Sequence, residues 1–137
     1  MFRNIGAVLI GLVGGAMVNM GLITLNMMVL FPTPPGMELG DAVAMQAYID
    51  QLPVTAFLVV ILAHLGQAGV GGWIAARIAG THPRRLAMIV AGLTLLGGLL
   101  NAQQIDAPAW TYIEMPLYLV VGWIAGTVEE RRRATAG

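Results

Sequence analysis

The chain has 137 residues, of which 58% are hydrophobic and 10% charged, and its mean hydropathy is +0.79. Soluble domains carry about 25% charged residues, so this composition excludes an ordinary soluble protein and indicates one that lies in a membrane. The seven basic and seven acidic residues balance, which argues against a nucleic-acid partner, and the lack of cysteine excludes disulfides and thiolate chemistry.

Four stretches are long and apolar enough to cross a bilayer as helices, which need about 20 residues each. We predict spans at 5–31, 54–79, 86–105 and 109–128. With short connections, these spans use the whole length. The sequence therefore predicts a single all-α transmembrane domain over 1–137, an integral membrane four-helix bundle with the lipid bilayer as its first partner.

The first span and the loop after it carry clear boundary signals. Arg3 before an apolar run is typical of a signal peptide, but the run continues to about Phe31, beyond the usual 7–15 residues. We therefore predict an uncleaved first span, ended by the proline-rich segment 32–36. Asp41 then suits the N-cap of a short helix that ends near Gln51 and lies in the outer membrane interface.

The basic residues fix a predicted orientation. All seven are arginines, and they precede the first span, flank the second turn or follow the fourth span: Arg3, Arg77, Arg84, Arg85, Arg131, Arg132 and Arg133. The acids of the other two loops are Glu38, Asp41, Asp50 and Asp106. Because short loops rich in arginine stay cytoplasmic, we predict a multi-pass protein of the plasma (inner) membrane with both termini cytoplasmic. The tail after Val128 is predicted to begin as a helical extension, with Glu129 and Arg133 paired one turn apart.

Small and polar residues recur along one face of each span. Lipid gives helices no hydrophobic reason to associate, so close approach at small residues and interhelical hydrogen bonds must hold them together. The glycines predicted to pack the helices are Gly11, Gly15, Gly71, Gly72, Gly98 and Gly122. Most of them fall in the cytoplasmic half, and the polar residues fall nearer the outside, which predicts a polar pocket that opens outward.

Glu114 is the only acid inside a predicted span. Ionised groups in the bilayer are costly and usually mark substrate or proton paths. At about 1.5 Å per residue, His64 lies roughly 7 Å deeper than Glu114, so the two side chains can reach each other directly or through water. A neutral pair, an ionised pair and a bond from Glu114 to Asn26 all remain open. The predicted ligand- or proton-binding residues are Glu114, His64, Asn26, Asn19, Gln67 and Tyr118.

No catalytic or cofactor pattern accompanies these residues. Met17, Met20, Met27 and Met28 do not share one helical face, so they do not form a copper site with His64. The second histidine, His82, falls on the other side of the membrane, which argues against haem. No nucleophile–base arrangement or metal-binding spacing is present. We therefore predict no metal, no cofactor and no enzymatic activity.

Two functions remain open on this pattern. The first is binding or translocation of a small molecule or ion through the polar pocket, by a homo-oligomer because four short helices leave little room for a pathway. The alternative is a non-catalytic accessory or assembly subunit, whose small-residue faces dock a larger membrane partner. A structural role for His64 and a shallow, water-reaching Glu114 would suit this alternative.

Overall fold

The computed structural model describes residues 2–136 as an all-helical chain, which confirms the predicted fold class. Its segments are α1 Phe2–Leu25, η1 Asn26–Leu30, α2 Ala42–Ile49, α3 Val54–Ile78, α4 Pro83–Ala102, η2 Ala109–Ile113 and α5 Glu114–Ala136. The π-helical η1 continues α1, and the 3-10 helix η2 leads into α5. The four long helices that result are each long and apolar enough to cross a membrane, as in a multi-pass membrane protein.

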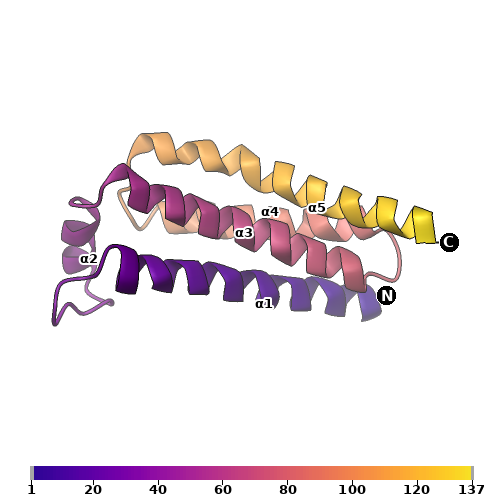
Figure 1. Cartoon of the computed structure of the whole chain (residues 1–137), viewed down its shortest axis with the longest axis horizontal. Coiled ribbons are helices and arrows are strands. Elements are labelled where there is room, and N and C mark those ends of the chain that lie inside the picture. Colours follow the sequence, from indigo (N-terminus) through magenta and orange to yellow (C-terminus); the bar gives the residue numbers. More distant parts are fainter. Residues whose placement is uncertain (1, 137) are drawn as a thin grey trace.

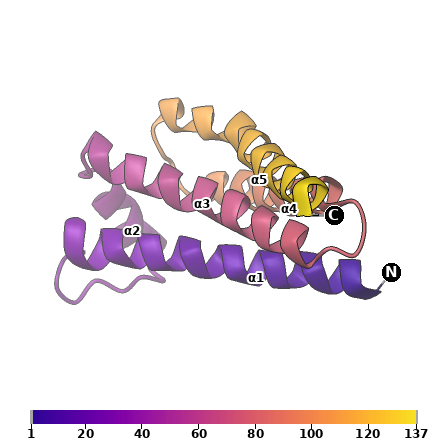
Figure 2. The same cartoon turned by 45° about the vertical axis from the view of Figure 1, so that its right-hand side comes forward.

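The central helix of the bundle is α3, which packs against α1, α4 and α5. Figures 1 and 2 show α1 and α5 on opposite sides of α3. Both ends of the chain lie at one end of the bundle, here called the termini end, and α2 lies at the other, here called the α2 end. Helices α1 and α4 meet near the termini end, where Ala7 and Val90 belong to one buried apolar cluster.

The long helices differ from the predicted spans chiefly at two places. Helix α4 begins at Pro83 instead of residue 86, because a proline at the first helical position lacks only a donor that no helix uses there. The preceding His82 adopts a left-handed conformation (φ 50°), which completes the turn from α3. Helix α5 continues to Ala136, so the charged tail extends the fourth span as a helix.

The short helix α2 folds across its end of the bundle. Its predicted cap is confirmed, since the Asp41 carboxylate accepts from the amides of Val43 at 2.9 Å and Ala44 at 3.2 Å. Tyr48 is buried, and its hydroxyl donates to the carbonyl of Phe31 at 2.6 Å. Burial raises the pKa of Tyr48, so this hydroxyl stays a neutral donor that ties α2 to the end of the first span.

Glycines bring α1 and α3 into backbone contact. A Cβ on Gly11 would lie 2.5 Å from the carbonyl oxygen of Gly71, and one on Gly71 would lie 2.6 Å from the carbonyl oxygen of Gly11. A Cβ on Gly15 would overlap the carbonyl group of Gln67. No side chain fits at these three positions, so the two backbones approach as closely as only glycine permits.

The glycines on the other helices face partners within the same chain. A Cβ on Gly122 of α5 would overlap the side chain of Ala91 on α4, and one on Gly98 would lie 2.8 Å from the hydroxyl of Tyr118. Gly72 faces α4 less tightly, with its nearest neighbouring atom at 3.3 Å. These small residues therefore pack the bundle itself and are not left free on its surface.

A buried carboxylate at the termini end gathers the arginines of the tail. Glu129 has no exposed surface and accepts from Arg132 at 2.7 and 2.8 Å, from Arg133 at 3.0 Å and from Arg77 at 3.4 Å. The predicted pairing of Glu129 with Arg133 is thus confirmed. The sequence indicated only this one pair, whereas the structure shows a packed ion cluster, termed below the Glu129 cluster.

Arginines also close the last turn of α3. The last carbonyls of a helix have no partner within it, and cations suit the negative end of its dipole. Arg133 donates to the carbonyls of Ala76 at 2.6 Å and Ala79 at 3.0 Å, and Arg3 donates to that of Ile78 at 2.8 Å. The first and last helices thereby fasten the termini end of α3.

Candidate functional site: a cavity with a histidine–glutamate pair

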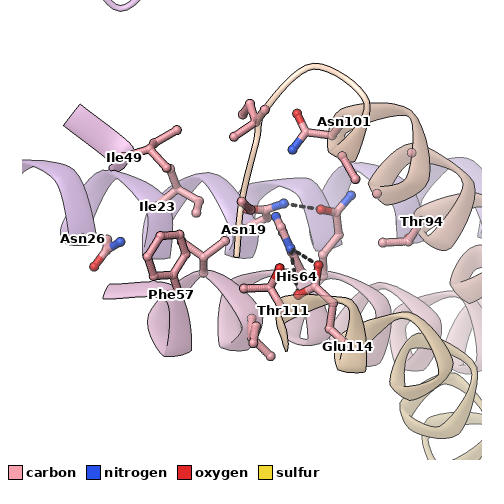
Figure 3. A pocket seen from close by; sticks show the side chains of 18 of the residues that line it. Asn19, Ile23, Asn26, Ile49, Phe57, His64, Thr94, Asn101, Thr111 and Glu114 are labelled. Atoms are coloured by element: carbon pink, nitrogen blue, oxygen red, sulfur yellow. Dashed lines mark hydrogen bonds and ion pairs between the residues drawn. The ribbon is translucent and has the colours of Figure 1, made fainter. Parts of the chain in front are cut away.

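A cavity of about 660 Å³, partly open to the outside of the molecule, lies toward the α2 end of the bundle. Its wall is formed by all four long helices, and α2 contributes Met45, Tyr48 and Ile49. Pockets for small ligands commonly measure about 300–1,000 Å³, so this cavity has the size of a ligand site. Figure 3 shows polar side chains from α1, α3, α4 and α5 around it. The six residues predicted as ligand- or proton-binding all line it: Asn19, Asn26, His64, Gln67, Glu114 and Tyr118.

The Glu114 carboxylate turns into the bundle and meets His64. The imidazole Nδ1 lies 3.0 and 3.1 Å from the two carboxylate oxygens, and the Tyr118 hydroxyl donates to one of them at 3.5 Å. Glu114 is only 5% exposed. The rings of His64 and Tyr118 stack with centroids 6.3 Å apart, which holds the imidazole in place. The carboxylate therefore faces polar partners and not the lipid side of α5.

Local helix geometry accounts for this meeting. Tyr118 follows Glu114 by one turn of α5, so both side chains share one face. The segment before Glu114 is the 3-10 helix η2, which rises about 2.0 Å per residue instead of 1.5 Å. Over its five residues this places Glu114 roughly 2.5 Å deeper than an α-helix would. The extra depth brings the carboxylate toward the level of His64.

A second polar pair lies one turn further along α3. The side-chain amide of Asn19 on α1 donates to the amide oxygen of Gln67, three residues after His64. The close approach of α1 and α3 at Gly15 makes this bond possible, because Gln67 forms part of that contact. The bond leaves the Asn19 oxygen and the Gln67 amino group available to a ligand in the cavity.

Asn26 occupies a different part of the cavity wall. It begins the π-helical turn η1, a widened turn of a kind often found at functional sites. Its amino group donates to the carbonyl of Ala56 at 3.3 Å. No bond joins it to Glu114 among the described residues, so of the three arrangements left open by the sequence the structure contains a Glu114–His64 pair.

With an ionised carboxylate and a neutral imidazole, the pair holds one proton, which must lie on Nδ1 because both nearby oxygens are acceptors, and its net charge is −1. A second proton brings the net charge to 0, either as an imidazolium beside the carboxylate or as a carboxyl group that donates to Nδ1 while the ring proton lies on Nε2. The other titratable groups in the cavity wall are the tyrosines Tyr48, Tyr112 and Tyr118.

Comparison with known proteins adds nothing to this geometry: no protein-family model, curated protein or solved structure matches the chain. Within residues 2–136, no group of three or more histidine, aspartate or glutamate side chains is placed to hold a metal ion.

Proposed function

We propose that this protein binds a small molecule or ion in the cavity and exchanges it for a proton on the His64–Glu114 pair. The observation that carries the proposal is the pair itself, two ionisable side chains in contact inside a ligand-sized space between membrane helices. Intramembrane ionisable groups are costly and mark transport or proton paths by default. A purely structural pair would need no cavity of about 660 Å³ beside it, room for roughly 20 water molecules.

The net charge of the His64–Glu114 pair determines how ligand binding should depend on pH. A cationic or hydrogen-bond-donating ligand is attracted to the pair when its net charge is −1, and it competes with the second proton. Ligand binding should therefore release a proton and weaken as the pH falls. An anionic ligand would show the opposite pH dependence.

The arginine distribution supports an orientation for this exchange. The termini end carries all seven arginines, and the cavity lies at the α2 end, where the loops are acidic. We place the protein in the plasma (inner) membrane with its termini in the cytoplasm, so that the cavity opens outward. The Gly11–Gly71 contact of α1 and α3 lies nearer the termini end than the cavity residues Asn19 and Gln67. Complete translocation would require that contact to separate.

Replacing Glu114 by glutamine tests the proposal. The protein in lipid nanodiscs, in weakly buffered solution with a pH dye, receives the chloride salts of sodium, potassium, methylammonium and decylammonium at matched pH. We expect at least one probe to release up to one proton per wild-type chain. The Glu114→Gln variant should lose this release at least tenfold, because its amide still bonds to His64 but cannot hold or give up the proton.

Glu130→Gln is the matched control, since it removes a carboxylate at the termini end, outside the cavity. Its proton release should equal that of the wild type. An equal release from a folded Glu114→Gln variant would contradict the proposal, and so would the absence of release from the wild type with every probe.

An accessory role would have to use other surfaces than those indicated by the sequence. The packing glycines on α1, α3 and α5 face helices of the same chain, so they cannot also dock a partner. The outward side of α1 carries larger apolar groups instead, among them Val13, Met17 and Met20. We propose the bilayer as the neighbour of this face, and a homo-oligomer or a larger membrane protein would have to pack against the same large side chains.

A further inference from the structure

Helix α4 contributes exposed residues to the cavity wall. Helices α1 and α4 are in contact near Ala7 and Val90, and residues of both line the cavity further toward the α2 end. On α4, Leu93, Gly97 and Asn101 line the cavity, are spaced four residues apart and are exposed, Leu93 to 45%. Their exposure is the reason to place a lateral opening of the cavity between α1 and α4, where acyl chains would lie.

A buried acceptor in the cavity lacks a donor. Asn26 is 2% exposed, and its Oδ1 has no hydrogen-bond partner among residues 2–136. A carbonyl accepts and does not donate, so the amino group of Asn26 must face the carbonyl of Ala56 and the oxygen of Asn26 is left over. A buried acceptor without a donor destabilises the folded chain. A ligand donor could satisfy this oxygen once the Asn26 side chain turns toward the cavity.

The charges around the cavity select against anions. None of the seven arginines lines it, and among residues 2–136 its only ionisable groups besides tyrosines are His64 and Glu114. The hydrogen-bond acceptors in the wall include the Glu114 carboxylate and the side-chain oxygen of Asn19. Apolar side chains such as Ile23, Phe57 and Leu93 form much of the remaining wall. The space therefore suits a donor-rich, positively charged head with an apolar body.

We propose that the ligand is a lipophilic amine that enters from the membrane between α1 and α4, with its ammonium group at Glu114 and its alkyl chain toward the opening. This inference rests on the proposed function and names the class of ligand and its route. A primary ammonium group offers three N–H donors, and its positive charge replaces the second proton on the His64–Glu114 pair. The alkyl chain stays in an apolar environment throughout entry.

The sequence offers a matched pair of glycines to test the route. A Cβ on Gly97 or on Gly92 meets no atom within 4 Å, so both α4 positions accept a side chain without disturbing the bundle. Gly97 lines the cavity and is exposed, whereas Gly92 does not line it. A phenylalanine at Gly97 should therefore obstruct the opening, and one at Gly92 should leave it free.

Decylamine carrying a diazirine in its chain is the probe, with the full-length protein in phosphatidylcholine nanodiscs. After irradiation, intact mass spectrometry gives the labelled fraction. Labelling of the wild type should be competed by unmodified decylamine, and the Gly97→Phe variant should be labelled at least tenfold less than Gly92→Phe. The corresponding diazirine-bearing decanoic acid should label all three proteins only at background level.

Equal labelling of the Gly97→Phe and Gly92→Phe variants would overturn the lateral route, and specific labelling by the decanoic acid probe would overturn the ligand class. If methylammonium or a metal cation releases Glu114-dependent protons while the decylamine probe fails to label, this inference fails and the proposed function stands. If no probe releases protons or labels the cavity, both fail.

Discussion

We expect the Gly11→Leu variant to have a free energy of unfolding about 3 kcal/mol lower than that of the wild type. Overpacking a close contact typically costs about 1–3 kcal/mol, and here the neighbouring atoms belong to a backbone, which cannot move aside as a flexible side chain can. The Cβ alone would lie 2.5 Å from the carbonyl oxygen of Gly71 and 2.9 Å from the Cβ of Ala75. Relief requires α1 and α3 to move apart over the whole crossing. Loss of helical circular dichroism on titration with sodium dodecyl sulfate measures the effect.

Gly21 provides the control on the same helix. A Cβ there meets no atom within 4 Å, so Gly21→Leu keeps the packing and gains the helix propensity that glycine lacks, about 0.5–1 kcal/mol. The two variants should therefore shift the unfolding midpoint in opposite directions. A Gly11→Leu protein as stable as the wild type would show that α1 and α3 do not cross at the Gly11–Gly71 contact.

Removal of the Glu129 carboxylate is the second large effect expected. Breaking a buried ion pair costs about 3–5 kcal/mol when both partners are buried. Here the arginine side chains stay 30–48% exposed, so we expect about 2 kcal/mol for Glu129→Ala. The variant also frees Arg133, which caps the carbonyls of Ala76 and Ala79. The same detergent titration measures the loss.

The exposed neighbour Glu130 provides a control in which the same charge is removed but no buried group is lost. Glu130 forms a 3.5 Å pair with Arg84 in which both side chains are well exposed, and such pairs contribute about 0–1 kcal/mol. Glu130→Ala should thus alter stability by less than about 0.5 kcal/mol while removing the same formal charge. Equal losses of stability in Glu129→Ala and Glu130→Ala would show that the net charge at the termini end stabilises the protein and that the packing of the Glu129 cluster does not.

The architecture could be read from the sequence because length and hydropathy alone determine which segments can cross a bilayer. The proline-rich segment 32–36 and the cap at Asp41 likewise act locally, so the end of the first span and the start of α2 were predictable. The start of α4 at Pro83 was missed, since the span was placed after the arginines instead of at the proline that precedes them. A hydropathy profile places charged residues outside a span, even where they belong to the first turn of its helix.

The site was harder to derive than the helices. Depths calculated for a uniform α-helix could not decide whether Glu114 and His64 are in contact. One reason is the 3-10 helix η2, in which the rise per residue differs from that of an α-helix. Asn26, whose buried oxygen has no partner, stands at the first residue of the π-helical turn η1, a turn that no periodicity in the sequence indicates. The burial of Glu129 is a tertiary property, because Arg77 reaches it from α3, 52 residues away in the chain.

Cysteine accessibility offers the most direct test of the central claim, since the natural chain has no cysteine to remove. Single cysteines at Thr94 and Gln67 would line the cavity, and one at Leu62 would face lipid. In vesicles whose orientation is known from a C-terminal tag, a membrane-impermeant maleimide should label the two cavity positions only from the α2 side and leave Leu62→Cys unlabelled. Labelling of the cavity positions from the termini side, or of Leu62→Cys in preference to them, would contradict a polar cavity between the four helices that is reached from the α2 side.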